Sequence, residues 1–275
     1  MIKDIVLSLP LNDGKGDVTG YAVSLAGAFK ARLTGVAFAY EKMPLGLLGD
    51  ERWVESVEQL CKEAEDAAKG ATGRFRQAAN SAGVAIETRL ITTTFRGTAE
   101  QFGRLARRFD LAVAQQSEAP DGSADHLIIQ AALFDSGRPV LVVPAARKGA
   151  AKFDRVIVCW DGGRAAARAL ADAFPFLQRA KAIELLTIGD RAKGEGLPVA
   201  DIAIHLGSHG LVVETREINA DDLNVTDQIL SRATESGADL IVMGAYGHSR
   251  LREFVLGGAT RGVLAAMPAP TLLSH

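Results

Sequence analysis

The sequence repeats itself once, and this internal repeat constrains the fold more than any other feature of the chain. Three apolar segments of the first half return in the second: 5–9 as 155–160, 110–114 as 239–243, and 138–144 as 269–275. Two related halves of ordinary domain size account for 275 residues better than one large sheet. We therefore predict two domains, residues 1–147 and 148–275, joined through a small, basic segment at 145–152.

Within each half, apolar runs of strand length alternate with segments in which apolar residues recur every three or four positions. Strands are expected at 5–9, 33–39, 84–91, 111–114, 139–143, 155–160, 182–188, 211–218, 240–243 and 270–273. Helices are expected at 18–32, 53–82, 98–108, 126–135, 164–176, 197–206, 225–236 and 260–267. Such alternation is typical of an α/β fold, in which helices cover both faces of a parallel sheet.

The bulk composition excludes several classes of protein. Hydrophobic residues make up 48% and charged residues 23%, and the formal net charge of −2 argues against a nucleic-acid binder. No stretch approaches the roughly 18 apolar residues of a membrane span, and the chain enters its first strand without a signal-peptide pattern. Cys61 and Cys159 have no metal-ligand spacing and are expected to be reduced core residues. We expect a cytoplasmic protein without a metal site.

The stretch 239–260, DLIVMGAYGHSRLREFVLGGAT, carries the strongest functional signal. Four apolar residues are followed by Gly244, Gly247 and the pair Gly257-Gly258, and a helix is expected behind them. Glycines let the backbone approach a bulky ligand, and a helix N-terminus favours an anion. The stretch therefore predicts a strand, a phosphate-binding loop and a helix.

At this point the second half resembles a universal stress protein domain. The residues that carry the resemblance are VIVCWDGG at 156–163, the whole of 239–260, and PAPTLL at 268–273. The full chain resembles the tandem members of that family, in which two such domains are fused. The resemblance implies two tandem Rossmann-like domains of the adenine nucleotide alpha hydrolase-like class, each with a five-stranded parallel sheet. It also implies that ATP, with or without Mg²⁺, binds at the carboxyl ends of the strands. ADP and AMP are the alternative ligands.

The resemblance assigns roles to individual residues of the second half. Asp161 would accept a hydrogen bond from the ribose or the adenine, and Ile188 would contact the adenine through its backbone. The other nucleotide-binding positions are Gly244, Gly247, Gly257, Gly258, Ala259 and Thr260, with His248 and Arg250 as further candidates for the phosphates. An alternative for Asp161 is that it only caps the helix expected at Arg164.

The chain departs from the family pattern in two places. The Ser or Thr that follows the third glycine in the family is Gly258 here, and Thr260 would supply a hydroxyl instead. In the first half, the matched positions are Pro10 for Asp161, Gln115 for Gly244, and His126-Leu127 for Gly257-Gly258. These changes predict that the N-terminal domain keeps the fold and has lost the nucleotide site.

No catalytic constellation is apparent in the sequence. The chain has no nucleophile elbow, no HExxH motif and no Walker lysine after the glycines, and His205, His209 and His275 are interpreted as ordinary surface residues. The leading hypothesis is a stress-response protein that binds ATP in its C-terminal domain and signals through occupancy. The alternatives are a slow ATPase or adenine-nucleotide hydrolase, and a nucleotide-independent scaffold or binder of another small molecule.

The expected partners are an adenine nucleotide and a second copy of the chain. Family domains commonly pair through their last strands, and 139–143 and 270–273 are short apolar candidates for such edges. Pseudo-symmetric pairing of the two domains within one chain is the alternative to a dimer. No nucleic acid or membrane partner is expected.

Overall fold

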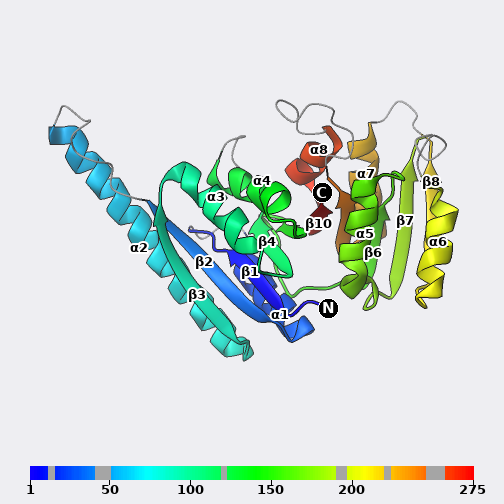
Figure 1. Ribbon diagram of the computed structural model, residues 1–275, viewed down its shortest axis with the longest axis horizontal. Coiled ribbons are helices and arrows are strands. Elements are labelled where there is room, and N and C mark those ends of the chain that lie inside the picture. The colour runs from blue at the N-terminus through cyan, green and yellow to red at the C-terminus, as the bar shows by residue number, and fades with distance from the viewer. Residues whose placement is uncertain (12–15, 41–50, 119–122, 190–196, 220–223, 246–257) are drawn as a thin grey trace. The chain divides into compact units, whose positions relative to one another are not determined.

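The computed structural model describes residues 1–11, 16–40, 51–118, 123–189, 197–219, 224–245 and 258–275, with the backbone alone for 51–57. The chain divides into two compact units (Figure 1). The N-terminal unit comprises Ile2–Ser136 and Ala145–Ala151. The C-terminal unit comprises Gly137–Pro144 and Lys152–His275, together with Met1.

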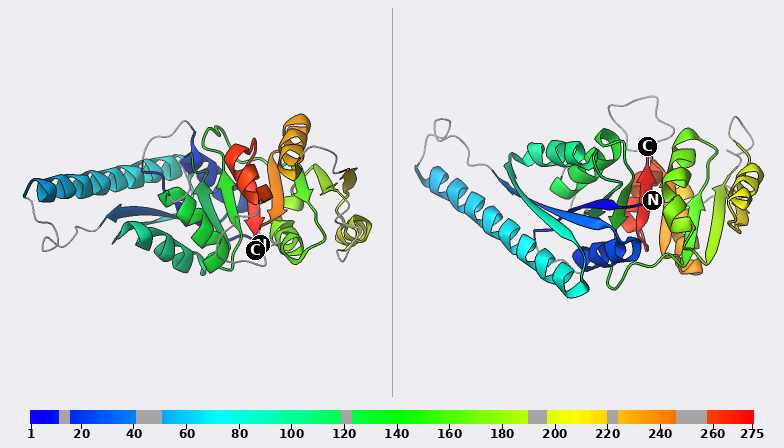
Figure 2. Two further views of the ribbon diagram at one scale, coloured as in Figure 1. Left: turned by 90° about the horizontal axis from the view of Figure 1, so that it is seen from above. Right: turned by 60° about the horizontal axis from the view of Figure 1, so that its bottom comes forward.

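The N-terminal unit is a parallel sheet with helices on both faces. Its strands are β1 (Asp4–Ser8), β2 (Arg32–Tyr40), β3 (Ile86–Thr93) and β4 (Leu111–Gln115), and its helices are α1 (Val18–Phe29), α2 (Glu51–Ala82), α3 (Phe95–Ala106) and α4 (Ala124–Asp135). The strand order is β3-β2-β1-β4, and every pair in this run is parallel. Figures 1 and 2 show α1 and α2 on one face of this sheet and α3 and α4 on the other.

Local capping decides where the helices of this unit begin and end. α1 ends at Phe29 instead of the predicted Arg32, because Lys30 adopts a left-handed conformation (φ 51°) and its N–H caps the last turn. α3 begins three residues before its predicted start, because the Thr94 side chain accepts a hydrogen bond from the Gly97 N–H at 3.1 Å. α4 begins at Ala124 for the same reason, with Ser123 as its N-cap.

The long helix α2 packs on β2 through a contact between a glycine and an aromatic ring. A Cβ at Gly35 would lie 2.7 Å from the Phe75 ring, and Phe75 is fully buried. Only glycine leaves room for the ring at this point of the sheet. The apolar stripe of α2, predicted from the sequence, therefore packs against β2 at Gly35.

The C-terminal unit repeats the same architecture with two additional strands, β5 and β10. Its strands are β5 (Val140–Val143), β6 (Arg155–Cys159), β7 (Ala182–Ile188), β8 (Glu214–Ile218), β9 (Leu240–Gly244) and β10 (Thr271–Ser274), and its helices are α5 (Arg164–Leu177), α6 (Val199–Ser208), α7 (Val225–Ser236) and α8 (Gly258–Ala266). The strand order is β5-β10-β9-β6-β7-β8. In Figures 1 and 2, α5 and α6 lie on one face of this sheet and α7 and α8 on the other. The α/β fold class predicted from the repeat is confirmed.

β5 and β10, the two strands that the sequence suggests as pairing edges, pair with each other. They run antiparallel, with Leu141 opposite Leu272, whereas β10 and β9 are parallel. β10 thus has a hydrogen-bonded neighbour on each side. Pairing of β10 with a second copy of the chain would require β5 to leave it.

Several predicted bounds in this unit shift by a few residues. β8 begins at Glu214 instead of position 211, α6 covers Val199–Ser208 instead of 197–206, and α8 begins at Gly258 instead of Thr260. Pro198 explains the later start of α6, because it occupies the N-cap position with φ −57° and ψ 144°. Among the helices in the described parts of the chain, none is long and apolar enough to cross a membrane.

Candidate functional site

The order of the strands creates a topological switch point in the C-terminal sheet. There, the connections that leave the neighbouring strands β6 and β9 run to opposite sides. From β6 the chain crosses through α5 to β7 on one side, while β9 lies on the other side of β6. Cys159 at the end of β6 pairs in register with Met243, next to the end of β9. In open α/β sheets, ligands bind outside the carboxyl ends of the strands at such a point. The segments that follow β6 and β9 therefore define the candidate site.

Asp161 lies two residues after β6, in the turn that leads into α5. Its Oδ1 accepts a hydrogen bond from the Gly163 N–H at 2.8 Å, and Gly162 between them has φ 77°. The N-cap of α5 is Gly163, which makes no side-chain capping bond. Asp161 is therefore not the N-cap that the alternative interpretation expects; it holds the turn before the helix and stays partly exposed at the switch point.

Ile188 ends β7 on the other side of β6. It is partly buried and pairs in register with Ile218 of β8. The following residue, Gly189, has φ 78° and donates its N–H to the Ile218 carbonyl at 2.8 Å. The strand therefore ends in a turn that only glycine adopts without strain, at the edge of the sheet where Asp161 lies.

Gly244, the last residue of β9, is required by packing. A Cβ at this position would lie 2.4 Å from the Ala165 carbonyl carbon and 2.4 Å from the Ala166 nitrogen. The first turn of α5 thus sits directly on the end of β9. This contact brings the N-terminus of α5 to the switch point, so the glycine shapes the site through backbone approach.

Gly258 and Thr260 differ sharply in exposure. Gly258 begins α8, is exposed, and has open space around the position of a Cβ. Ala259 is partly buried, and Thr260 is only 3% exposed. Positions 258 and 260 are the two candidates for a hydroxyl that binds phosphate. The accessible position, 258, carries a glycine, and the threonine at 260 is buried. Gly247, His248, Arg250 and Gly257 lie outside the described residues.

The corresponding edge of the N-terminal unit is built differently. Pro10 follows β1 where Asp161 follows β6, and Gln115 ends β4 where Gly244 ends β9. The Ser123 side chain caps α4 by accepting a hydrogen bond from the His126 N–H at 3.3 Å. One N–H of the first turn of this helix therefore has a partner within the chain, and the loss of the nucleotide site in this unit stays a prediction.

The neighbouring thiol of Cys159 is held in its protonated form. Burial, followed by the negative charges of Asp161 and Glu184, raises the pKa of Cys159 to about 12. The nucleophilic form of cysteine is the thiolate, so this side chain remains a protonated thiol at neutral pH. Both cysteines are free. Among the described residues, no cluster of three or more His, Cys, Asp or Glu side chains could hold a metal ion.

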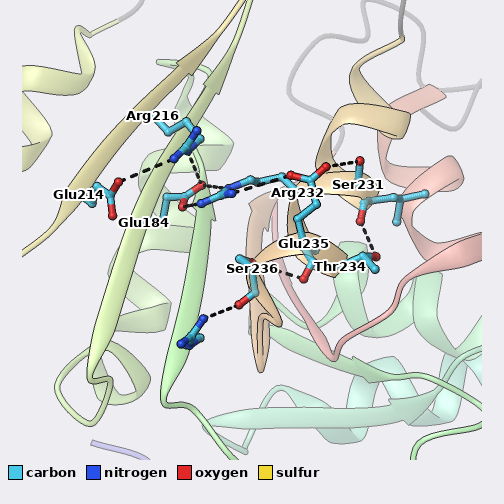
Figure 3. Close-up of polar contacts among 11 residues, drawn as sticks. Glu184, Glu214, Arg216, Ser231, Arg232, Thr234, Glu235 and Ser236 are labelled. Carbon is cyan, nitrogen blue, oxygen red and sulfur yellow. Dashed lines mark hydrogen bonds and ion pairs between the residues drawn. The ribbon is translucent and has the colours of Figure 1, made fainter.

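A buried ion pair lies on the α7 face of the same sheet (Figure 3). The Arg232 guanidinium on α7 donates two hydrogen bonds to the Glu184 carboxylate on β7, at 2.8 and 2.5 Å. Arg216 of β8 approaches the same carboxylate at 3.6 Å. These residues are far apart in the chain, so no local sequence pattern marks them as a group. The arrangement pairs the Glu184 carboxylate with two guanidinium groups and holds α7 on the sheet, so we assign it to stability.

Comparison with known proteins defines the family of the C-terminal part. Residues 152–275 match the family model described as "Universal stress protein family". A comparison with curated proteins gave no match.

Two solved structures share the fold over almost the full length of the chain. A universal stress protein from Archaeoglobus fulgidus DSM 4304 is 18% identical, with a TM-score of 0.69 and coverage of 98% of this chain and 97% of that one. A candidate universal stress protein from Pseudomonas aeruginosa UCBPP-PA14 is 16% identical, with a TM-score of 0.59 and coverage of 99% and 93%. The fold is thus common to both units, and the match to the universal stress protein family is carried by residues 152–275.

Proposed function

We propose that this protein binds an adenine nucleotide at the carboxyl ends of β6, β7 and β9 and acts in stress signalling through the occupancy of that site. One observation carries the proposal. Asp161, Ile188 and Gly244, which the family resemblance assigns to the nucleotide, end the three strands around the switch point or lie within two residues of a strand end. ATP is the preferred ligand, and ADP and AMP are the alternatives.

Each of these groups has a chemical role toward a nucleotide. The Asp161 carboxylate is an acceptor for a ribose hydroxyl or the adenine amino group. The backbone at Ile188 offers donors and acceptors to the adenine edge. The N-terminus of α8 at Gly258 presents backbone N–H groups and partial positive charge to the phosphates. If Mg²⁺ accompanies ATP, it would neutralise phosphate charge.

A signalling role fits this site better than fast catalysis. The segment 239–260 contains no lysine to neutralise a transferring phosphate, and Cys159 is a protonated thiol. For occupancy to act as a signal, the nucleotide must bind two conformations of the protein with unequal affinity.

Two measurements test the proposal. The purified chain is denatured, and the released small molecules are separated by chromatography; the nucleotide-free chain is then titrated with ATP, ADP and AMP in a calorimeter, with and without Mg²⁺. We expect at least one adenine nucleotide to bind. No released nucleotide, together with no heat of binding, would contradict the proposal.

Asp161 supplies a matched pair of variants. Asp161→Asn keeps an acceptor for the Gly163 N–H and removes the charge, whereas Asp161→Ala removes both. We expect both to weaken nucleotide binding and only the alanine variant to lower the melting temperature appreciably. Unchanged nucleotide affinity in both variants would assign Asp161 to the turn alone.

A further inference from the structure

A separate pocket of about 330 Å³ lies between α5 and α6 in the C-terminal unit. Its lining comes from one residue after β6, four on α5 and four on or just before and after α6: Trp160, Ala167, Leu170, Ala171, Phe174, Leu197, Ile202, His205 and His209. None of these is among the residues assigned to the nucleotide. The volume is at the lower end of the range typical of small-molecule sites.

The walls of the pocket are apolar and rich in rings. Trp160 is 3% exposed, and its indole N–H already donates to the Leu197 carbonyl at 2.8 Å. The indole therefore presents carbon atoms to the pocket and has no donor left for a ligand. Phe174 adds a second ring, which packs edge-to-face on His209 with 4.8 Å between the centroids. Surfaces of this kind favour a planar, aromatic ligand.

Two imidazoles provide the polar groups of the pocket. His205 and His209 lie one turn apart at the end of α6, with ring centroids 4.9 Å apart, and both are exposed at the rim. Within the described parts of the chain, their ring nitrogens have no hydrogen-bond partner. Among the described residues, the lining contains no carboxylate, lysine or arginine. A neutral imidazole offers one N–H donor and a charged one offers two, so the rim suits an acceptor or anionic group.

We propose that this pocket binds a small aromatic molecule that carries one anionic group. The rings of such a ligand would lie between Trp160, Leu170 and Phe174, and its anionic group would accept hydrogen bonds from His205 and His209. Trp160 directly precedes Asp161 in the chain. One residue of the pocket wall is therefore adjacent in the chain to a residue of the proposed nucleotide site, although the two sites share no residue.

Fluorescence provides a direct test, because Trp160 lies in the pocket wall and Trp53 is the chain's other tryptophan. In a Trp53→Phe background, the full chain is titrated with 1-anilinonaphthalene-8-sulfonate, an aromatic anion, and energy transfer from Trp160 is recorded. N-phenyl-1-naphthylamine, which has the same rings without the sulfonate, is the matched ligand. We expect saturable transfer with both probes and tighter binding of the anion.

Variants localise the probe. Ala171→Leu fills the pocket from α5, whereas Ala200→Leu adds the same volume at an exposed position of α6 outside the lining. We expect only Ala171→Leu to abolish transfer. Replacing both histidines with alanine should weaken binding of the sulfonate by about fivefold or more, as for the loss of one or two hydrogen bonds, and leave the neutral probe unchanged.

Three outcomes would overturn the proposal. The first is that neither probe transfers energy with Trp160. The second is that binding survives in Ala171→Leu at the affinity of Ala200→Leu, with both variants folded by circular dichroism. The third is that saturating ATP displaces the probe competitively, which would assign the probe to the nucleotide crevice. Equal loss of both probes on removal of the histidines would contradict the anionic part of the proposal.

Discussion

Gly244 at the end of β9 and Ala165 in the first turn of α5 are in backbone contact: a Cβ on the glycine would lie 2.4 Å from the alanine carbonyl carbon. The distance is shorter than any real Cβ contact, and the obstacle is backbone, which cannot rotate away. The sequence pattern predicts the same glycine as part of a ligand-binding loop. Its first role is to let the helix reach the strand end where the site is formed.

Gly244→Ala should therefore destabilise the protein. We expect a loss of about 1–3 kcal/mol in the free energy of unfolding, because α5 must move off β9. Gly258→Ala is the matched control, since its Cβ meets open space and glycine is a poor helix former. Urea denaturation followed by circular dichroism measures both. Equal stability of the two variants would refute the packing role of Gly244.

Gly258→Ser should strengthen ATP binding. The position is exposed at the start of α8, so a serine fits and adds a hydroxyl where the family resemblance expects one. One additional hydrogen bond corresponds to about fivefold in affinity. Calorimetry with ATP and AMP checks it: the gain should be larger for ATP, which carries the additional phosphates. A gain of the same size for AMP would indicate that α8 does not face the terminal phosphates.

Cys159 should resist thiol reagents in the folded protein. In a Cys61→Ser variant it is the one remaining thiol, and its pKa of about 12 leaves almost no thiolate at pH 8.5. We expect its reaction with an aromatic disulfide reagent to be on the order of a thousandfold slower than in urea. Reaction at the same rate before and after unfolding would contradict the protonated state of the Cys159 thiol.

The same shift has a consequence for stability at alkaline pH. The pKa of Cys159 is raised above its ordinary value of 9.0 in the folded state, so the unfolded chain releases this proton first. The contribution of the protonated Cys159 thiol to the free energy of unfolding is fully present below pH 9. It is lost as the pH rises from 9 toward 12. Cys159→Ala should lower this pH dependence in urea denaturation series between pH 8 and 10.5, with Cys61→Ala as the control.

Removing one partner of the Glu184–Arg232 pair should be costly. The Glu184 side chain is 10% exposed, and Arg232→Met takes away both of its short hydrogen bonds. We expect a loss of about 3–5 kcal/mol in the free energy of unfolding, because a buried carboxylate loses its main partner. The Glu184 hydrogen bond also raises the pKa of Arg232, so the arginine stays charged at every pH tested.

The double variant Glu184→Met/Arg232→Met distinguishes the stability contributed by the ion pair from the stability contributed by packing around it. Replacing both charges with apolar side chains of similar length should recover most of the stability lost in Arg232→Met. A double-mutant cycle completed with Glu184→Met gives the coupling energy. If the double variant is as unstable as Arg232→Met, the loss arises from packing and the ion pair contributes little.

Most of the fold could be predicted from the sequence, because periodicity and repetition are local signals. The apolar runs and the stripes at steps of three and four identify the strands and helices, and the internal repeat identifies two copies of one architecture. The predicted ends of the helices are less accurate where a capping residue sets the end. Lys30 ends α1 through a left-handed conformation that a lysine rarely adopts, and no residue type in that segment announces it.

The alternation of strands and helices, the family resemblance and the candidate residues at the ends of β6, β7 and β9 can all be predicted from the sequence. What those residues contact depends on the tertiary structure. It gave Gly244 a packing role, buried Thr260 while leaving Gly258 exposed, and joined Glu184 to Arg232 across 48 positions of the chain. It also gathered Trp160, Phe174 and two histidines into one pocket. The reason is physical: propensity and periodicity act over a few residues, whereas close approach, burial and ion pairing depend on how distant segments pack.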